Sequence, residues 1–236
     1  MRVNRFYFPQ AVRESGVIDD LAICSQIKKV LRLVLGDELI LFDGNGLESL
    51  VKISSFGPKN IFFEVLEQRI FTPPPRRVNL FLAILKKENF DWAVLKSVEV
   101  GVANVFPIIS DRTIKLGLNY ERLNLIVKEA VEQSGQKFLP KISPALKFEQ
   151  AIKLATGKGE VNLFAEVGNY IPRFLIDKID LSGDDINVWI GPEGGWSPRE
   201  IKLAQDKSFN FVSLGENILR AETAAVVASW LAVNKK

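Results

Sequence analysis

The sequence contains no histidine and a single cysteine, Cys24, among its 236 residues. Without histidine there can be no Ser-His-Asp or Cys-His nucleophile, no histidine-ligated zinc and no histidine general base. One cysteine excludes an internal disulfide, a CxxC redox pair and an all-cysteine metal site. The chemistry must therefore come from carboxylates, Lys, Arg, hydroxyl side chains, the Cys24 thiol, backbone dipoles or a cofactor that arrives already reactive.

Long apolar stretches are also missing. The first residues contain no apolar segment of the kind found in secretory signals, and no run approaches the roughly 18 residues that would span a bilayer. A lone cysteine suits a reducing compartment. The sequence therefore predicts a cytoplasmic protein that does not enter a membrane.

The composition that is present is typical of a globular chain, with 47% apolar residues, 25% charged residues and a net charge of +3. The length suits one large domain or two small ones. Basic residues outnumber acidic ones only over residues 73–160. Such an excess can attract a polyanion, but it also suits an ordinary solvated surface, so charge alone leaves RNA binding open.

Three consecutive prolines at residues 73–75 predict a domain boundary, because such a run cannot lie inside a helix or a central strand. Before it we expect strands at 5–8, 38–42, 47–53 and 61–66, with one helix at 20–31. The segment Asp43-Gly44-Asn45-Gly46 is typical of a hairpin turn, since both glycines can take a positive φ. Residues 1–72 are therefore predicted to form a mainly β domain.

After the prolines, apolar strands alternate with helices. We expect strands at 78–85, 105–109, 161–167, 186–190 and 209–214, and helices at 90–100, 119–134, 144–155 and 198–207, with a last helix ending near 233. The helix at 198 is well specified, because Ser197, Pro198 and Glu200 provide an N-cap, an N1 proline and a capping box. The alternation predicts an α/β domain with a mostly parallel sheet over residues 73–236.

A glycine-rich segment, Gly191-Pro192-Glu193-Gly194-Gly195, lies between a buried strand and that capped helix. Ligands of α/β proteins bind at the carboxyl ends of strands, and glycines let a ligand approach the backbone. A plain strand-to-helix turn would need fewer glycines, so we favour a binding loop. The segment is neither a P-loop nor a Rossmann fingerprint, since no Lys-Ser/Thr follows and the spacing differs.

The second segment, residues 214–224, also runs from a strand into a helix. Arg220 and Glu222 fall at the junction, where their charged groups can face a pocket. Glu222 can equally be a first-turn residue that favours the helix dipole. The residues alone leave these two interpretations open.

Together the two segments resemble the ribosomal RNA small subunit methyltransferase E family. The resemblance rests on Gly191–Gly195 and on Leu214-Gly215, Ile218-Leu219-Arg220 and Glu222-Thr223-Ala224, and it covers nearly the whole chain. Supporting pieces are Val30-Leu31-Arg32-Leu33, Gly36-Asp37, Lys86-Lys87, Glu99-x-Gly101-Val102, Glu129-Ala130 and Glu132-Gln133-Ser134.

The resemblance implies a PUA-like β-barrel for RNA over residues 1–72 and an α/β SPOUT methyltransferase domain with a trefoil knot over residues 73–236. In such a knot the segment 214–223 passes through a loop near 191–196, and the cofactor lies at the crossing. The family acts as homodimers and uses S-adenosylmethionine to methylate N3 of a uridine in 16S ribosomal RNA. The expected substrate form is the assembled small ribosomal subunit, and no metal is expected.

The reaction that the resemblance implies suggests candidate residues. Arg220 would stabilise the uridine anion, and the proton would be accepted by Glu222, by another carboxylate or by solvent. Cofactor contacts, mainly through the backbone, would come from Ile190, Gly191, Gly194, Gly195, Leu214, Gly215, Ile218, Leu219 and Ala224. RNA contacts would come from Arg5, Arg32, Lys86, Lys87 and Gln133.

The missing histidine is compatible with this chemistry, because S-adenosylmethionine carries its own activated methyl group. Two positions depart from the family pattern: Gln136 stands where an arginine is common and Gln26 where a histidine is frequent. Two alternatives stay open. The chain could be a SPOUT methyltransferase for another RNA base or a ribose 2′-hydroxyl, or a non-catalytic RNA-binding ribosome-assembly factor.

Overall fold

A computed structural model describes residues 3–10, 12, 14–114, 117–157, 159–167, 174–175, 178–183 and 185–235. The chain divides into two compact units. The first comprises Met1–Pro73 and Val131–Leu139, and the second comprises Pro74–Ala130 and Pro140–Lys236. The short segment Val131–Leu139 was not separated from the second domain by the sequence analysis.

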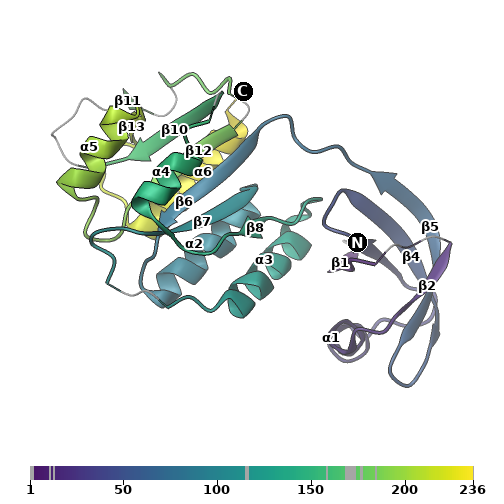
Figure 1. The fold of residues 1–236 in the computed structure, drawn as a ribbon. Helices are drawn as coiled ribbons and strands as arrows, with labels where there is room; N and C mark the ends of the chain where they lie inside the picture. The colour runs from purple at the N-terminus through teal and green to yellow at the C-terminus, as the bar shows by residue number, and fades with distance from the viewer. Residues whose placement is uncertain are drawn as a thin grey trace. The chain divides into compact units, whose positions relative to one another are not determined.

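The first unit is built on one five-stranded sheet, shown in purple and blue in Figure 1. Its spatial order is β1-β3-β4-β5-β2, in which β1 and β3 are parallel and the other neighbours are antiparallel. The strands are β1 (Asn4–Tyr7), β2 (Ser15–Ile18), β3 (Glu38–Phe42), β4 (Leu47–Phe56) and β5 (Ile61–Ile70). The four expected strands are present, and β2 was missed.

The predicted hairpin joins β3 to β4, and its glycines do more than turn the chain. Gly44 and Gly46 have φ values of +74° and +105°. The segment 137–139 lies against this turn, since the Gly46 N–H donates to the Lys137 carbonyl at 3.1 Å and the Leu139 N–H to the Gly44 carbonyl at 2.8 Å. A Cβ atom on Gly44 would lie only 2.9 Å from Leu139 Cβ, so a larger residue would obstruct this approach.

The expected helix over 20–31 is present in two parts. The α-helix α1 (Leu21–Ser25) is capped by Asp20, whose carboxylate accepts the backbone N–H groups of Ala22 and Ile23. It continues as a single π-helical turn, η1 (Gln26–Val30). The helix ends just before Arg32, which has a φ of +53° and breaks the helical path.

The second unit contains a sheet in which all paired strands are parallel (Figure 1). Its order is β11-β13-β10-β12-β6-β7-β8, and β9 also pairs with β7. The strands are β6 (Arg77–Ala83), β7 (Asn104–Ile109), β8 (Lys141–Ile142), β9 (Leu146–Lys147), β10 (Glu160–Ala165), β11 (Phe174–Leu175), β12 (Asp185–Ile190) and β13 (Asn210–Ser213). The parallel α/β arrangement expected from the alternation is confirmed, and the short strands β8, β9 and β11 were missed.

Helices lie on both faces of this sheet, and Figure 1 shows α4 and α6 on opposite faces. They are α2 (Lys87–Glu99), α3 (Tyr120–Ser134), α4 (Phe148–Leu154), α5 (Pro198–Asp206) and α6 (Ala221–Asn234). The predicted capping box at the start of α5 is present, with Ser197 accepting from the Glu200 N–H. No helix within the described ranges is both long and apolar enough to cross a membrane.

Aromatic side chains fill the core on the α4 and α5 face of the sheet. Trp189 of β12 is fully buried and stacks on Phe81 of β6, with ring centroids 4.2 Å apart. Phe164 of β10 stacks on Trp196 at 4.8 Å, and Phe148 of α4 packs against both tryptophans. Rings at these separations bury a large apolar area, which holds the strand ends that carry the loops described below.

A row of asparagines crosses the central strands. Asn104 donates its Nδ2 to Asn79 at 2.8 Å, Asn79 to Asn187 at 2.9 Å, and Asn187 to Asn162 at 3.2 Å. These residues are direct cross-strand partners in β7, β6, β12 and β10. Asn162 also accepts the Trp189 indole N–H at 2.9 Å. Shifting any one of these strands by a residue would break the row, so it specifies the register of the sheet.

Candidate functional site

The second unit contains a cavity of about 810 Å³ at the carboxyl ends of strands β10, β12 and β13. Strand ends are where α/β folds place ligands, and this volume is in the usual range for a small-molecule site. Both segments singled out in the sequence border it. The lining residues are Lys86, Asn89 and residues 165–167, 190–193, 195–196, 212–222 and 224.

The glycine loop, residues 191–196, forms one wall of the cavity around a buried tryptophan. Trp196 is 3% exposed, and its Nε1 donates to the Ala165 carbonyl at 3.1 Å. A Cβ atom on Gly191 would lie 3.1 Å from the Trp196 indole, which leaves little space for a side chain. Gly195 has a φ of +70°, and its N–H donates to the Pro192 carbonyl at 2.8 Å to close the turn. The glycines therefore let the backbone form the cavity surface.

The second wall is the segment from Leu214 to Arg220, between β13 and α6. Gly215 has a φ of +135°, a conformation that favours glycine, and a Cβ added there would meet no atom of the described ranges within 4 Å. Its carbonyl accepts the Ser213 hydroxyl at 2.9 Å. Ile218 is 80% exposed, so its apolar side chain is available to a ligand in the cavity.

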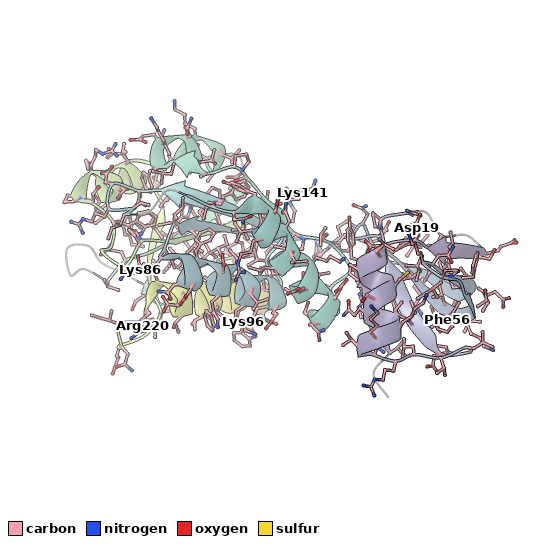
Figure 2. The ribbon with its side chains drawn as sticks, turned by 90° about the horizontal axis from the view of Figure 1, so that it is seen from below. Asp19, Phe56, Lys86, Lys96, Lys141 and Arg220 are labelled. Atoms are coloured by element: carbon pink, nitrogen blue, oxygen red, sulfur yellow. The ribbon has the colours of Figure 1, made fainter. Side chains whose placement is uncertain are left out.

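Two cations lie at the edge of the cavity, each at the start of a helix. Lys86 is the N-cap residue of α2 and Arg220 that of α6, and neither side chain caps its helix. Both are exposed, and Figure 2 shows them on the same side of the second unit. The helix dipoles add positive potential at these ends. This edge therefore suits a group that carries or develops negative charge.

Glu222 supplies the acidic group of the site. It lies in the first turn of α6 and lines the cavity. Its Oε2 is buried and has no hydrogen-bond partner among the described residues. A buried carboxylate oxygen without a partner is costly, and a ligand that donates a hydrogen bond to it would remove that cost.

Most predicted cofactor residues line the cavity, as do both predicted catalytic residues. Gly194 does not; its carbonyl accepts instead from Arg112 Nη1 at 2.6 Å. Asn89 and Glu193 also line the cavity and were not predicted, although the glycine segment had included Glu193. The Glu193 Oε1 accepts the Lys86 N–H at 3.2 Å, which joins the glycine loop to the start of α2.

The residues predicted to contact RNA have different environments. Arg5 is 8% exposed and forms an ion pair with Glu48, and its Nη2 donates to the Gln136 carbonyl at 2.9 Å. Both contacts lie within the first unit and stabilise it. Arg32 is exposed, Lys86 borders the cavity and Lys87 begins α2.

Gln133, the remaining predicted RNA contact, lies in the part of α3 that belongs to the first unit.

Among the four tryptophans, Trp189 and Trp196 are buried, whereas Trp92 and Trp230 are 44% and 53% exposed. Within the described ranges no group of three or more acidic or cysteine side chains could hold a metal ion.

Both parts of the chain are similar to domains of known RNA methyltransferases. A family model described as an RNA methyltransferase domain matches residues 72–232, and one described as an RNA methyltransferase PUA domain matches residues 27–66. Ribosomal RNA small subunit methyltransferase E of Rickettsia conorii is 32% identical over 232 residues, which cover 97% of this chain and 94% of the relative. The chain belongs to the ribosomal RNA small subunit methyltransferase E family.

Other family members support this membership. The Synechocystis enzyme of the same name is 32% identical over 93% of this chain and 73% of its own length. The crystal structure of the Neisseria gonorrhoeae family member, bound to S-adenosyl methionine, superposes with a TM-score of 0.87 at 27% identity, covering 97% of this chain and 95% of that one. The expected fold, an α/β SPOUT methyltransferase domain preceded by a PUA-like domain, is confirmed.

Proposed function

We propose that this protein transfers the methyl group of S-adenosylmethionine to 16S ribosomal RNA, at N3 of a uridine. Membership in the family supports the reaction class, because the relatives are small-subunit ribosomal RNA methyltransferases. The observation that carries the proposal is the cavity itself. It brings the glycine loop together with Arg220 and Glu222, which lie on a separate segment beyond α5 and β13.

The cavity residues fit the cofactor. Its glycines let a ligand approach the backbone, and among the described residues Gly215 has open space beside it and the buried Glu222 Oε2 has no hydrogen-bond partner. When bound, S-adenosylmethionine supplies a methyl group already activated by its sulfonium centre. The residues that would hold it are Ile190, Gly191, Gly195, Leu214, Gly215, Ile218, Leu219 and Ala224. Gly194 would contribute only through the shape of the loop.

Two side chains would act on the base. Removing the N3 proton of a uridine places negative charge on the imide, which is delocalised onto O2 and O4. Arg220, exposed at the start of α6, stabilises that charge. Glu222 accepts the N3 proton at its Oε2, which has no competing donor among the described residues.

RNA would be bound by both units. Arg32, Lys86, Lys87 and Gln133 remain candidates for contacts with phosphates or bases, whereas Arg5 is engaged with Glu48. The domain of residues 1–72 would bind RNA, and the domain of residues 73–236 would carry out the reaction. We place the protein in the cytoplasm, where it would act on the assembled small ribosomal subunit.

A homodimer is part of the proposal. Trp92 of α2 and Trp230 of α6 expose large apolar surfaces on helices that pack against each other. Large exposed aromatic side chains are typical of protein interfaces.

The trefoil knot also remains a proposal. It is supported by the common cavity that the segment 214–222 and the glycine loop both line.

The test is methyl transfer from labelled S-adenosylmethionine to unmethylated small subunits and to naked 16S RNA, followed by mapping of the methyl group. Glu222→Gln is expected to lower kcat by about 10²–10⁴-fold, and Arg220→Ala by about 10²–10³-fold. Lys202→Ala is the matched control, because Lys202 pairs with Asp206 on α5 and does not line the cavity.

Three results would contradict the proposal, each in a different part. No binding of S-adenosylmethionine at millimolar concentration would favour a non-catalytic assembly factor. A methyl group on a ribose 2′-oxygen or another base would overturn the N3 assignment. Near-normal turnover of Glu222→Gln would remove Glu222 as the proton acceptor.

A further inference from the structure

The loop that follows β7 touches the glycine loop at the position that does not line the cavity. Arg112 Nη1 donates to the Gly194 carbonyl at 2.6 Å. A Cβ atom on Gly194 would lie 3.6 Å from Arg112 Cδ, so the arginine stem lies directly along the loop. Gly191 and Gly195, on either side of this contact, do line the cavity. Arg112 therefore contacts the loop without obstructing the surface that a ligand would use.

Asp111, the neighbour of Arg112, ties the same loop to the start of α5. Its N–H donates to Glu200 Oε1 at 2.9 Å, and the fully buried Glu200 accepts the Ser197 N–H through its other oxygen at 2.8 Å. The Asp111 carboxylate accepts from the Ser197 hydroxyl and from Arg199 Nη2, both at 2.5 Å. The hydrogen bond from Arg199 is the main reason that the pKa of Asp111 lies below its usual value.

These contacts hold in place the turn that carries Arg112. Ser110 is 5% exposed, and its N–H donates to the Thr113 hydroxyl at 3.0 Å, which closes the 110–113 turn. On its other side the glycine loop is held by Glu193, which accepts the Lys86 N–H, and by the buried Trp196. The loop is thus restrained at several points while its glycine backbone stays open to the cavity.

We propose that Arg112 is a positioning residue that, anchored through Asp111 and Glu200, holds the glycine loop in the conformation that accepts the cofactor. This inference rests on the proposed function, since it assumes that the cavity binds S-adenosylmethionine. A loop that is already ordered loses less conformational entropy when the cofactor binds, so the protein binds the cofactor more tightly. Because Arg112 is exposed, removing it changes the order of the loop much more than the stability of the unit.

The test compares Arg112→Ala, Arg112→Lys and Arg77→Ala. Arg77 is a matched control, because its ion pair with Asp185 at 2.7 Å joins the first residues of β6 and β12, at the other end of the strands. Calorimetry gives the Kd for S-adenosylmethionine, and hydrogen exchange without cofactor reports the order of residues 191–196. Thermal unfolding and kcat at saturating cofactor complete the set.

For Arg112→Ala we expect a Kd about tenfold higher, which corresponds to about 1.4 kcal/mol, and faster exchange in the glycine loop. Arg112→Lys should recover part of the affinity, because it can still donate to the Gly194 carbonyl. The unfolding temperature and kcat should stay close to those of the unmodified protein, as should every property of Arg77→Ala.

Unchanged loop exchange in Arg112→Ala would overturn the inference, as would an unchanged Kd. A Kd raised equally in Arg77→Ala would also overturn it, because the effect would then be general destabilisation. If the unmodified protein failed to bind the cofactor, the proposed function would fall. The exchange measurement would then still decide whether Arg112 orders the loop.

Discussion

Replacing Asn187 with alanine should destabilise the second unit strongly, because this residue is the centre of the asparagine row. Asn187 is 1% exposed. Its Oδ1 accepts from Asn79 at 2.9 Å, and its Nδ2 donates to both Asn162 and Glu160 at 3.2 Å. The truncation leaves the Asn79 amide without its acceptor in a site that is only 8% exposed. Asn162 keeps the Trp189 indole as a donor, so its oxygen stays satisfied.

The size of the effect follows from the group that loses its partner. One orphaned buried donor, together with the small cavity, gives a loss of about 2–3 kcal/mol. For a protein of this length that loss lowers the unfolding temperature by about 4–12 °C. Asn187→Asp should be worse at neutral pH, because it places a carboxylate where a donor faced Glu160.

Tryptophan fluorescence is the appropriate assay, since all four tryptophans belong to the second unit. Asn210→Ala is the matched control. Asn210 is half-buried and makes one hydrogen bond in the described network, to the Asn162 carbonyl at 3.3 Å, so we expect a loss below about 1 kcal/mol. Equal stability of Asn187→Ala and Asn210→Ala would refute the reasoning, because the row would then contribute nothing beyond ordinary partly exposed polar contacts.

Three further predictions concern other parts of the chain. Arg5→Ala should destabilise the first unit by about 1–3 kcal/mol, because the buried Glu48 loses one of its two cationic partners and keeps only Lys137, whose Nζ lies 2.9 Å from Glu48 Oε1; faster hydrogen exchange in β3 and β4 would reveal it, and unchanged exchange would argue against it. The pKa of Asp111 is lowered in the folded protein, so its stabilising effect is complete above the ordinary value of 3.8 and is lost as the pH falls below it. Removing Arg199 should therefore make the free energy of unfolding fall less steeply as the pH drops below 3.8. An unchanged pH dependence in that range would contradict this. Gly215→Ala should weaken cofactor binding and lower stability by about 1–3 kcal/mol, since alanine is strained at a φ of +135°; calorimetry and thermal unfolding would detect either effect, and an alanine variant as tight and stable as the parent would exclude such strain.

Local patterns in the sequence were enough to predict the longer helices and strands and both walls of the cavity, but not the short strands β2, β8, β9 and β11. Glycine and proline beside a strand end indicate a binding loop, and Ser197 with Glu200 specifies the start of α5. The asparagine row could not be predicted in this way. Each asparagine interrupts an apolar strand in isolation, and only the order β7-β6-β12-β10 brings them together.

Contacts between distant segments were missed for the same reason. Arg112 and Gly194 are 82 positions apart, and no spacing rule connects them. Arg5 was a candidate RNA contact under the family resemblance, and its ion pair was not foreseen. Its partner Glu48 lies 43 positions away, so the buried pair is visible only in three dimensions.

The membership of Val131–Leu139 in the first unit sets the order in which that unit can be completed during synthesis. Residues 1–73 are synthesised first. The Gly44 carbonyl and the Gly46 N–H can form their hydrogen bonds to Leu139 and Lys137 only after those residues have been synthesised. A nascent chain that has passed the proline stretch therefore holds a sheet whose hairpin turn is still open to solvent. The unit translated first forms its last hydrogen bonds only after more than half of the polypeptide has left the ribosome.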